Sequence, residues 1–138
     1  MISVSEGTYG KGDNGYNVIV GGSLFYGYDD HPRKLVVLNN KGLKSTAAGR
    51  YQLLSRYFDA YKKMLNLPDF SPDSQDKIAL QQIAERKALA DIDAGRIEQA
   101  IKKCSNIWAS FPGAGYGQRE NDMDKLLQAY KDAGGELA

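Results

Sequence analysis

Two short apolar runs stand in the first half of the chain, which otherwise carries few helix signals. Residues 16–20 and 34–38 are rich in aromatic and β-branched side chains, and turn-forming residues bound each run. Runs of this kind are typical of strands that bury one face. The pattern predicts two short strands of a small antiparallel sheet.

The second half has the spacing of helices. Apolar side chains recur at three- and four-residue steps between residues 54 and 65, which indicates an amphipathic helix. Ser71, Pro72 and Asp73 combine an N-cap hydroxyl, a first-turn proline and an acid that suits the positive end of a helix. The predicted helices cover residues 50–66, 71–87, 89–93, 96–104 and about 123–133, and the last closes at Gly134.

A small sheet followed by several helices predicts an α+β fold in which helices dominate. We expect residues 1–138 to form a single domain, since a chain of this length can bury a core without metal or disulfide. The lone Cys104 lies on an apolar helical face and is expected to be a core residue. A cleft is expected where the sheet lobe meets the helical lobe.

Charge and composition exclude several classes of protein. The net charge is +1 and the basic residues are dispersed, so no nucleic-acid partner is expected. Neither a signal peptide nor a run long enough for membrane insertion is expected. His31 is the only histidine and has no partner ligands in its segment, so neither a metal nor another cofactor is predicted.

Glu6 is the first candidate for chemistry. It stands in Ser5-Glu6-Gly7-Thr8, where the glycine that follows is typical of a helix end. A solvated helix terminus explains most such glutamates and stays open as the alternative. If burial raises its pKa, however, a carboxylic acid facing a cleft can protonate a sugar leaving group.

Residues 45–52 form the second candidate segment. Small residues there would let a ligand approach the backbone, and Tyr51 and Gln52 would offer polar groups from a first helical turn. The alternative is that Ser45 or Thr46 is simply a helix N-cap.

Residues 106–118 form the third candidate segment, a glycine-rich loop with aromatic residues. Sugar rings pack on aromatic planes, so Trp108 and Tyr116 are candidates for carbohydrate contact. Trp108 fits a core anchor equally well.

Together these segments resemble the phage-lambda type of endolysin, the lytic transglycosylases that degrade peptidoglycan. The motifs that carry the resemblance lie in residues 5–8, 15–22, 30–36, 45–55 and 104–118. The resemblance implies a lysozyme-like fold and cleavage of the β-1,4 bond between N-acetylmuramic acid and N-acetylglucosamine. It also implies a 1,6-anhydromuramic product.

The resemblance carries specific residues with it. The family's catalytic glutamate falls on Glu6. Its cleft motifs place Thr46, Tyr51, Gln52, Tyr116 and Gln118 near the substrate. Ser45 and Trp108, taken from the candidate segments themselves, complete the predicted substrate-binding set. Only residues 1–5 precede the glutamate, where the family has a helix of several turns, so we expect a truncated catalytic helix. So short a segment is not expected to be helical on its own.

Two other functions remain open. A hydrolytic lysozyme would need a second carboxylate, for which Asp13, Asp29 and Asp30 are the candidates, although all three occupy turn-like contexts. A non-catalytic peptidoglycan-binding relic is the other alternative.

The resemblance also implies a partner, an oligomeric state and a cellular location. The expected partner is the glycan strand of peptidoglycan, and the expected state is a monomer. The protein is expected in the host cytoplasm, from which a holin-dependent lesion would release it to the periplasm and cell wall.

Overall fold

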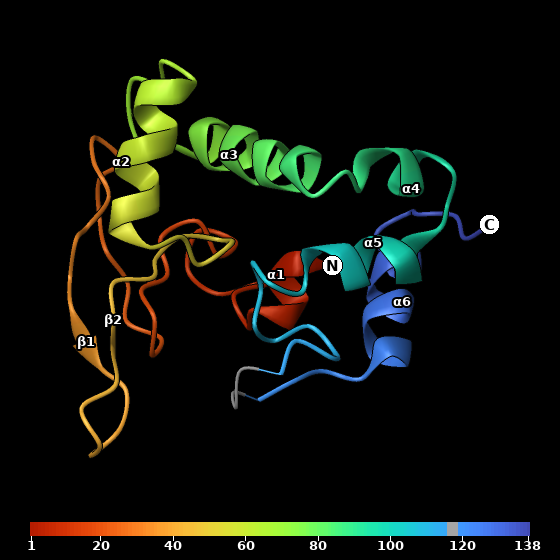
Figure 1. Ribbon diagram of the computed structural model, residues 1–138. Coiled ribbons are helices and arrows are strands. Elements are labelled where there is room, and N and C mark those ends of the chain that lie inside the picture. The colour runs from red at the N-terminus through yellow and green to blue at the C-terminus, as the bar shows by residue number, and fades with distance from the viewer. Residues whose placement is uncertain (116–118) are drawn as a thin grey trace. The chain divides into compact units, whose positions relative to one another are not determined.

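The computed structural model describes residues 1–115 and 119–138 and divides into two compact units (Figure 1). Unit 1 comprises residues 1–7 and 80–138, and unit 2 comprises residues 8–79. Among the described residues the elements are six helices and one two-stranded antiparallel sheet, so the α+β prediction with helices dominant is confirmed. The single domain expected over residues 1–138 stays a prediction.

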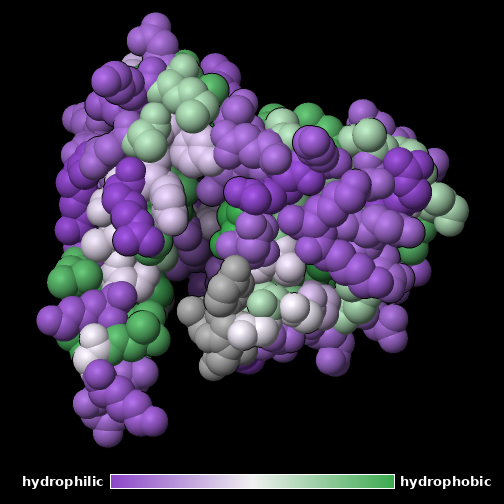
Figure 2. Space-filling view, in the orientation of Figure 1, coloured by the Kyte–Doolittle hydropathy of each residue, from purple (hydrophilic) through white to green (hydrophobic). Residues whose placement is uncertain are grey.

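The sheet of unit 2 is a hairpin. Strand β1 (Val36–Val37) pairs with strand β2 (Lys44–Ser45). Val36 packs against the unit's core whereas Val37 is exposed, the alternation expected of a strand with one buried face. Figure 2 shows hydrophobic side chains on the outer surface of this hairpin, where the exposed apolar residues are Leu35, Val37, Leu38 and Leu43.

The predicted strand over residues 34–38 is confirmed at its centre, but the one over residues 16–20 is wrong. Residues 14–17 form turns, and beyond them the backbone makes only isolated bridges, Val18 to Leu24 and Ile19 to Ala48. Val18 and Ile19 are both buried, so their side chains fill the core instead of extending a ladder. Gly21, with a φ of 91°, then turns the chain before a strand could continue.

Helix α2 (Ser55–Met64) begins five residues later than the periodicity predicts. Ala48 and Leu53 exchange backbone hydrogen bonds of 3.1 and 2.9 Å, which closes residues 49–52 into a tight loop. Gln52 has a φ of 54°, outside the helical region. Apolar spacing alone does not separate such a loop from a first helical turn, and the helix predicted from residue 50 was placed too early.

The core of unit 2 is aromatic and surrounds the only histidine. Phe58 and Phe70 are fully buried, and the His31 ring lies 5.9 and 4.9 Å from theirs. The Nδ1 atom of His31 accepts the Arg33 backbone N–H at 2.9 Å, and its Nε2 lies 2.8 Å from the Leu53 carbonyl oxygen. The ring is therefore neutral with its hydrogen on Nε2, and burial lowers its pKa. His31 has a structural role.

Unit 1 contains the short helix α1 (Ile2–Ser5), α4 (Leu89–Asp93), α5 (Ile97–Cys104) and α6 (Met123–Asp132), whereas α3 (Pro72–Glu85) runs from unit 2 into unit 1. The helices predicted from residue 71 onward are confirmed, with ends displaced by one or two residues. Helix α6 contacts both α1 and α5. Ile97, Ile101 and Cys104 are buried on one face of α5, as the apolar spacing predicts.

Candidate active site

Glu6 lies at the end of helix α1, as its setting before glycine predicts. It is the C-cap residue, and Gly7 follows with a φ of 75°, the left-handed turn that commonly ends a helix. Four residues are too few for an independently stable helix, so tertiary contacts must hold α1. The Asn121 side chain supplies one, because its Nδ2 donates to the Ser5 carbonyl oxygen at 3.0 Å.

The Glu6 carboxyl is half-buried and has a polar neighbour from the segment after α5. The Ser110 hydroxyl donates to Oε1 of Glu6 at 3.1 Å and also lies 2.7 Å from the Ser5 hydroxyl oxygen. Burial raises the pKa of Glu6 to about 7, although the Ser110 hydrogen bond acts in the opposite direction. Near neutral pH both protonation states are populated, so this carboxyl can give up a proton and take one back.

Ser45 and Thr46 make local hydrogen bonds within unit 2. The Ser45 hydroxyl oxygen accepts the Ala47 backbone N–H at 3.1 Å. The Thr46 hydroxyl oxygen accepts the Ser55 backbone N–H at 3.0 Å, and this N–H is one that the start of α2 leaves without a helical acceptor. Thr46 therefore caps a helix, as the alternative for this segment suggests, but from nine residues away.

Tyr51 belongs to a polar cluster that the sequence analysis did not find. Its hydroxyl donates to Oδ1 of Asp76 at 2.6 Å, and the Tyr16 hydroxyl donates to the same oxygen at 2.9 Å. The Arg50 guanidinium stacks over the Tyr16 ring at 5.2 Å. Burial and the hydrogen bond to Asp76 raise the pKa of Tyr51 far above its usual range. Tyr51 is thus held rigidly in unit 2.

Gln52 holds its own loop together. Its Nε2 donates to the backbone carbonyl oxygens of Gly49 at 2.9 Å and Val18 at 3.2 Å. The half-buried side chain therefore helps to keep Gln52 in the left-handed conformation that delays the start of α2.

In the third candidate segment, residues 106–118, the structure describes only one of the three predicted contact residues, Trp108. Trp108 is only 3% exposed and its ring lies 5.6 Å from that of Phe111. This burial favours the core-anchor alternative over direct contact with a sugar ring. Tyr116 and Gln118 lie outside the described residues. Glu120, which the sequence analysis missed, accepts the backbone N–H groups of Gly113 and Gly115 at 2.9 and 3.0 Å.

The three candidates for a second carboxylate all lie at exposed positions of unit 2. Asp30 forms an ion pair with Arg33 at 2.9 Å, which lowers the pKa of that carboxyl. Asp13 accepts the hydroxyl of Tyr28. Asp29 is exposed. For Asp13 and Asp30 these contacts are the loop-bracing roles that turn aspartates commonly have.

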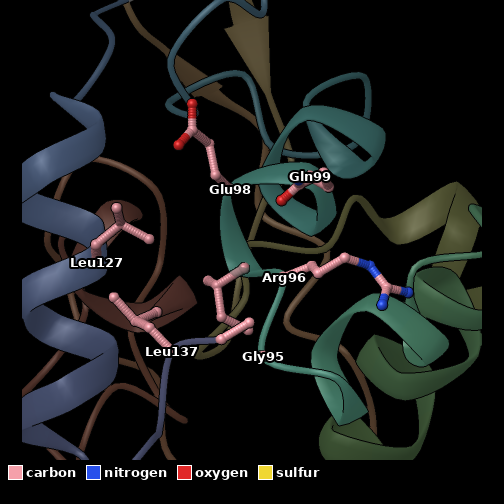
Figure 3. Close-up of a pocket in the computed structure, with 8 residues that line it drawn as sticks. Gly95, Arg96, Glu98, Gln99, Leu127 and Leu137 are labelled. Atoms are coloured by element: carbon pink, nitrogen blue, oxygen red, sulfur yellow. The ribbon is translucent and has the colours of Figure 1, made fainter.

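A pocket in unit 1 contains none of the predicted site residues. It has a volume of about 220 Å³ and lies between α5, α6 and the C-terminal residues, with Leu127 and Leu137 among its lining residues (Figure 3). Small-molecule sites usually measure at least about 300 Å³. In the described part of the chain, no group of three His, Cys, Asp or Glu side chains could hold a metal ion, and no helix could cross a bilayer.

Comparison with known proteins identifies the family of this chain. A model of the family described as "Endolysin" matches residues 1–137. The chain belongs to the endolysin family. It is 63% identical to the endolysin of Escherichia phage lambda, over 98% of this chain and 87% of that protein. It is 53% identical to the endolysin of Escherichia phage P2, over 98% of this chain and 89% of that protein. As an endolysin, it is an enzyme that degrades bacterial peptidoglycan and acts on the cell wall.

Solved endolysin structures agree with the fold. A structure of bacteriophage lambda lysozyme complexed with a chitohexasaccharide matches with a TM-score of 0.97 and 62% identity, and the match covers 99% of this chain and 91% of that one. A second structure of lysozyme from bacteriophage lambda matches with a TM-score of 0.91 and 61% identity over the same shares. The lysozyme-like fold predicted for this endolysin is therefore confirmed.

Proposed function

We propose that this endolysin is a lytic transglycosylase in which Glu6 is the only catalytic carboxylate. The proposal rests on the burial and the raised pKa of that side chain. Its carboxyl is half-buried at the end of α1, and its pKa is raised to about 7. A general acid works best when its pKa lies near the working pH, because it is then protonated often enough to donate and acidic enough to transfer.

The proposed reaction begins with protonated Glu6. Its proton passes to the glycosidic oxygen as the bond from that oxygen to the anomeric carbon of N-acetylmuramic acid breaks. The resulting carboxylate then removes the proton of the 6-hydroxyl of the same sugar. The 6-oxygen bonds to the anomeric carbon, which closes a 1,6-anhydro ring and returns Glu6 to its starting state.

This route requires no water and no second carboxylate. The attacking hydroxyl already belongs to the sugar, so little entropy is lost in positioning it. Hydrolysis by two carboxylates would instead need a partner for Glu6 at a defined separation. The loop contacts of Asp13 and Asp30 favour the single-carboxylate route, because those side chains already serve the fold.

The substrate proposed is the glycan strand of peptidoglycan. The proposed contacts are Ser45, Thr46, Tyr51, Gln52, Tyr116 and Gln118. Trp108, which is only 3% exposed, is proposed to be a core anchor and not a contact. The similar lambda lysozyme structure is a complex with a chitohexasaccharide, a chain of amino sugars, which supports glycan binding in this protein. For Thr46, Tyr51 and Gln52, the intramolecular hydrogen bonds support roles as fixed walls of a binding site.

The proposed setting follows from family membership. We propose that the protein is made in the host cytoplasm as a monomer and reaches the periplasm through a holin-dependent membrane lesion. Periplasmic activity before and after a holin-type lesion, measured on whole cells, tests the release step.

Mass spectrometry of digested peptidoglycan tests the reaction type. Transglycosylation leaves 1,6-anhydromuramic ends, whereas hydrolysis leaves reducing ends that carry one added water. Glu6→Gln is the control and should yield neither product above background. Predominantly reducing ends from the unaltered protein would replace the transglycosylase proposal with a hydrolytic lysozyme.

A further inference from the structure

The side chain of Asn121 has only one orientation compatible with its neighbours. The Lys125 ammonium lies 3.0 Å from one end of the Asn121 amide, and because an ammonium can only donate, that end must be the oxygen. The other end lies 3.0 Å from the Ser5 carbonyl oxygen and 3.3 Å from the Ser110 carbonyl oxygen, which can only accept. The Asn121 NH₂ group therefore points at Ser5 and Ser110.

This orientation fixes the direction of the hydroxyl hydrogen bonds. The Asn121 NH₂ group donates to the Ser5 hydroxyl oxygen at 3.1 Å, so that oxygen acts as an acceptor there. The Ser5 hydroxyl hydrogen is then free to point at the Ser110 oxygen, 2.7 Å away. Ser110 receives that bond and points its own hydrogen at Oε1 of Glu6, at 3.1 Å. From Asn121 through Ser5 and Ser110 to Glu6, each group in this hydrogen-bond chain donates to the next.

We infer that Asn121, Ser5 and Ser110 are positioning residues, and that their one-way hydrogen-bond chain leaves Oε2 of Glu6 as the oxygen that carries the transferred proton. The inference rests on the proposed function, in which Glu6 is the general acid. Because Oε1 accepts from Ser110, a proton on Oε1 would face the Ser110 hydrogen. The hydrogen-bond chain lies wholly in unit 1, together with Glu6.

The hydrogen-bond chain also sets how strongly Glu6 holds its proton. Hydrogen bonds to a carboxylate favour its ionised form, so Ser110 limits the rise in pKa that burial produces. The Ser5 and Asn121 side chains are buried, which shields these hydrogen bonds from exchange with water. Without Asn121, the Ser5 hydroxyl could accept from Ser110 and draw the Ser110 hydrogen away from Glu6.

The first test is the titration of Glu6 in Ser110→Ala, followed by ¹³C NMR of its side-chain carboxyl. Removing a hydrogen bond to a charged group should raise the pKa of Glu6 by about 1, which is about a tenfold increase in proton affinity. Ser110→Thr keeps the hydroxyl and should titrate like the unaltered protein. Ser105→Ala is the matched control, because the Ser105 hydroxyl donates only to an exposed backbone carbonyl of α5.

The second test removes the start of the hydrogen-bond chain and leaves Ser110 in place. Asn121→Leu keeps the branched outline of the side chain, at a larger volume, but supplies no donor, and it should raise the pKa of Glu6 by less than Ser110→Ala does. This variant keeps the inference testable if Ser110→Ala does not fold. A Glu6 titration unchanged in both variants would overturn the inference.

Activity separates this inference from the proposed function. If Glu6 is the acid, the alkaline limb of the rate profile on purified peptidoglycan should move to higher pH with the Glu6 titration in Ser110→Ala. A purely structural defect would lower the rate without moving that limb. If the NMR pKa rises while the limb stays in place, the hydrogen-bond chain is supported and the assignment of Glu6 as the acid is contradicted.

Discussion

Replacing Glu6 by glutamine should stabilise the protein at alkaline pH. The pKa of this carboxyl is about 7 in the folded protein, against 4.5 for an ordinary glutamate. Each pKa unit is worth about 1.36 kcal/mol, so ionising Glu6 destabilises the fold by up to about 3 kcal/mol. Partial exposure of the side chain reduces this figure to about 2 kcal/mol. The substitution keeps the size of the side chain and removes the charge.

The size of the stabilisation depends on pH. Below pH 4.5 the carboxyl is neutral in the folded and unfolded protein, and the variant should gain nothing. Between pH 4.5 and 7 the unfolded protein gives up the Glu6 proton while the folded protein still holds it, so the unaltered fold is progressively destabilised. The gain in stability of the variant should therefore reach its full value above pH 7.

Urea unfolding at acidic and alkaline pH measures the gain. Glu136→Gln makes the same chemical change at an exposed position of unit 1 and should leave the free energy of unfolding nearly constant relative to the unaltered protein. If Glu6→Gln changed the free energy of unfolding equally at both pH values, burial would not disfavour the ionised carboxyl. Glu6 would then lack the raised pKa on which the proposed acid depends.

Three further predictions concern unit 2 and are measured by urea or thermal unfolding. Phe58→Ala should cost about 3–5 kcal/mol because Phe58 is fully buried, and a loss below about 1 kcal/mol would contradict that packing. His31→Phe should cost about 1–3 kcal/mol by leaving two backbone groups unpaired. Since burial lowers the pKa of His31, its contribution to stability is complete above pH 6.5 and falls as the pH drops, and this loss should be absent from the variant. Gly49→Ala should destabilise because its Cβ would lie 2.4 Å from Gln75 Oε1 and 2.9 Å from Phe70 Cζ at a φ of 84°, and unchanged stability would refute the close approach.

Local signals account for the parts of the fold that the sequence predicted. Helix α3 was found because Ser71, Pro72 and Asp73 mark its start, and α5 because its apolar residues repeat on one face. The start of α2 was missed because the loop at residues 49–52 depends on hydrogen bonds from the Gln52 side chain, one of them to the Val18 carbonyl oxygen 34 residues away. No periodicity in the sequence reports such a contact.

The candidate site shows the same division. Glu6 could be predicted from its motif and its place before Gly7. Its neighbours Ser110 and Asn121 are more than a hundred residues away in the chain, and serine and asparagine at those positions have no distinguishing pattern. The cluster around Tyr51 was missed for the same reason, since Asp76 lies on another element.

The most direct test of the central claim is the rate at which Glu6→Gln cleaves purified peptidoglycan, measured beside the unaltered protein and Glu136→Gln. General acid catalysis contributes about 10²- to 10⁴-fold, so the rate of Glu6→Gln should fall by about a thousandfold while its binding of the wall is retained. Glu136→Gln should cleave normally. Cleavage by Glu6→Gln at a rate comparable to that of the unaltered protein would contradict the account.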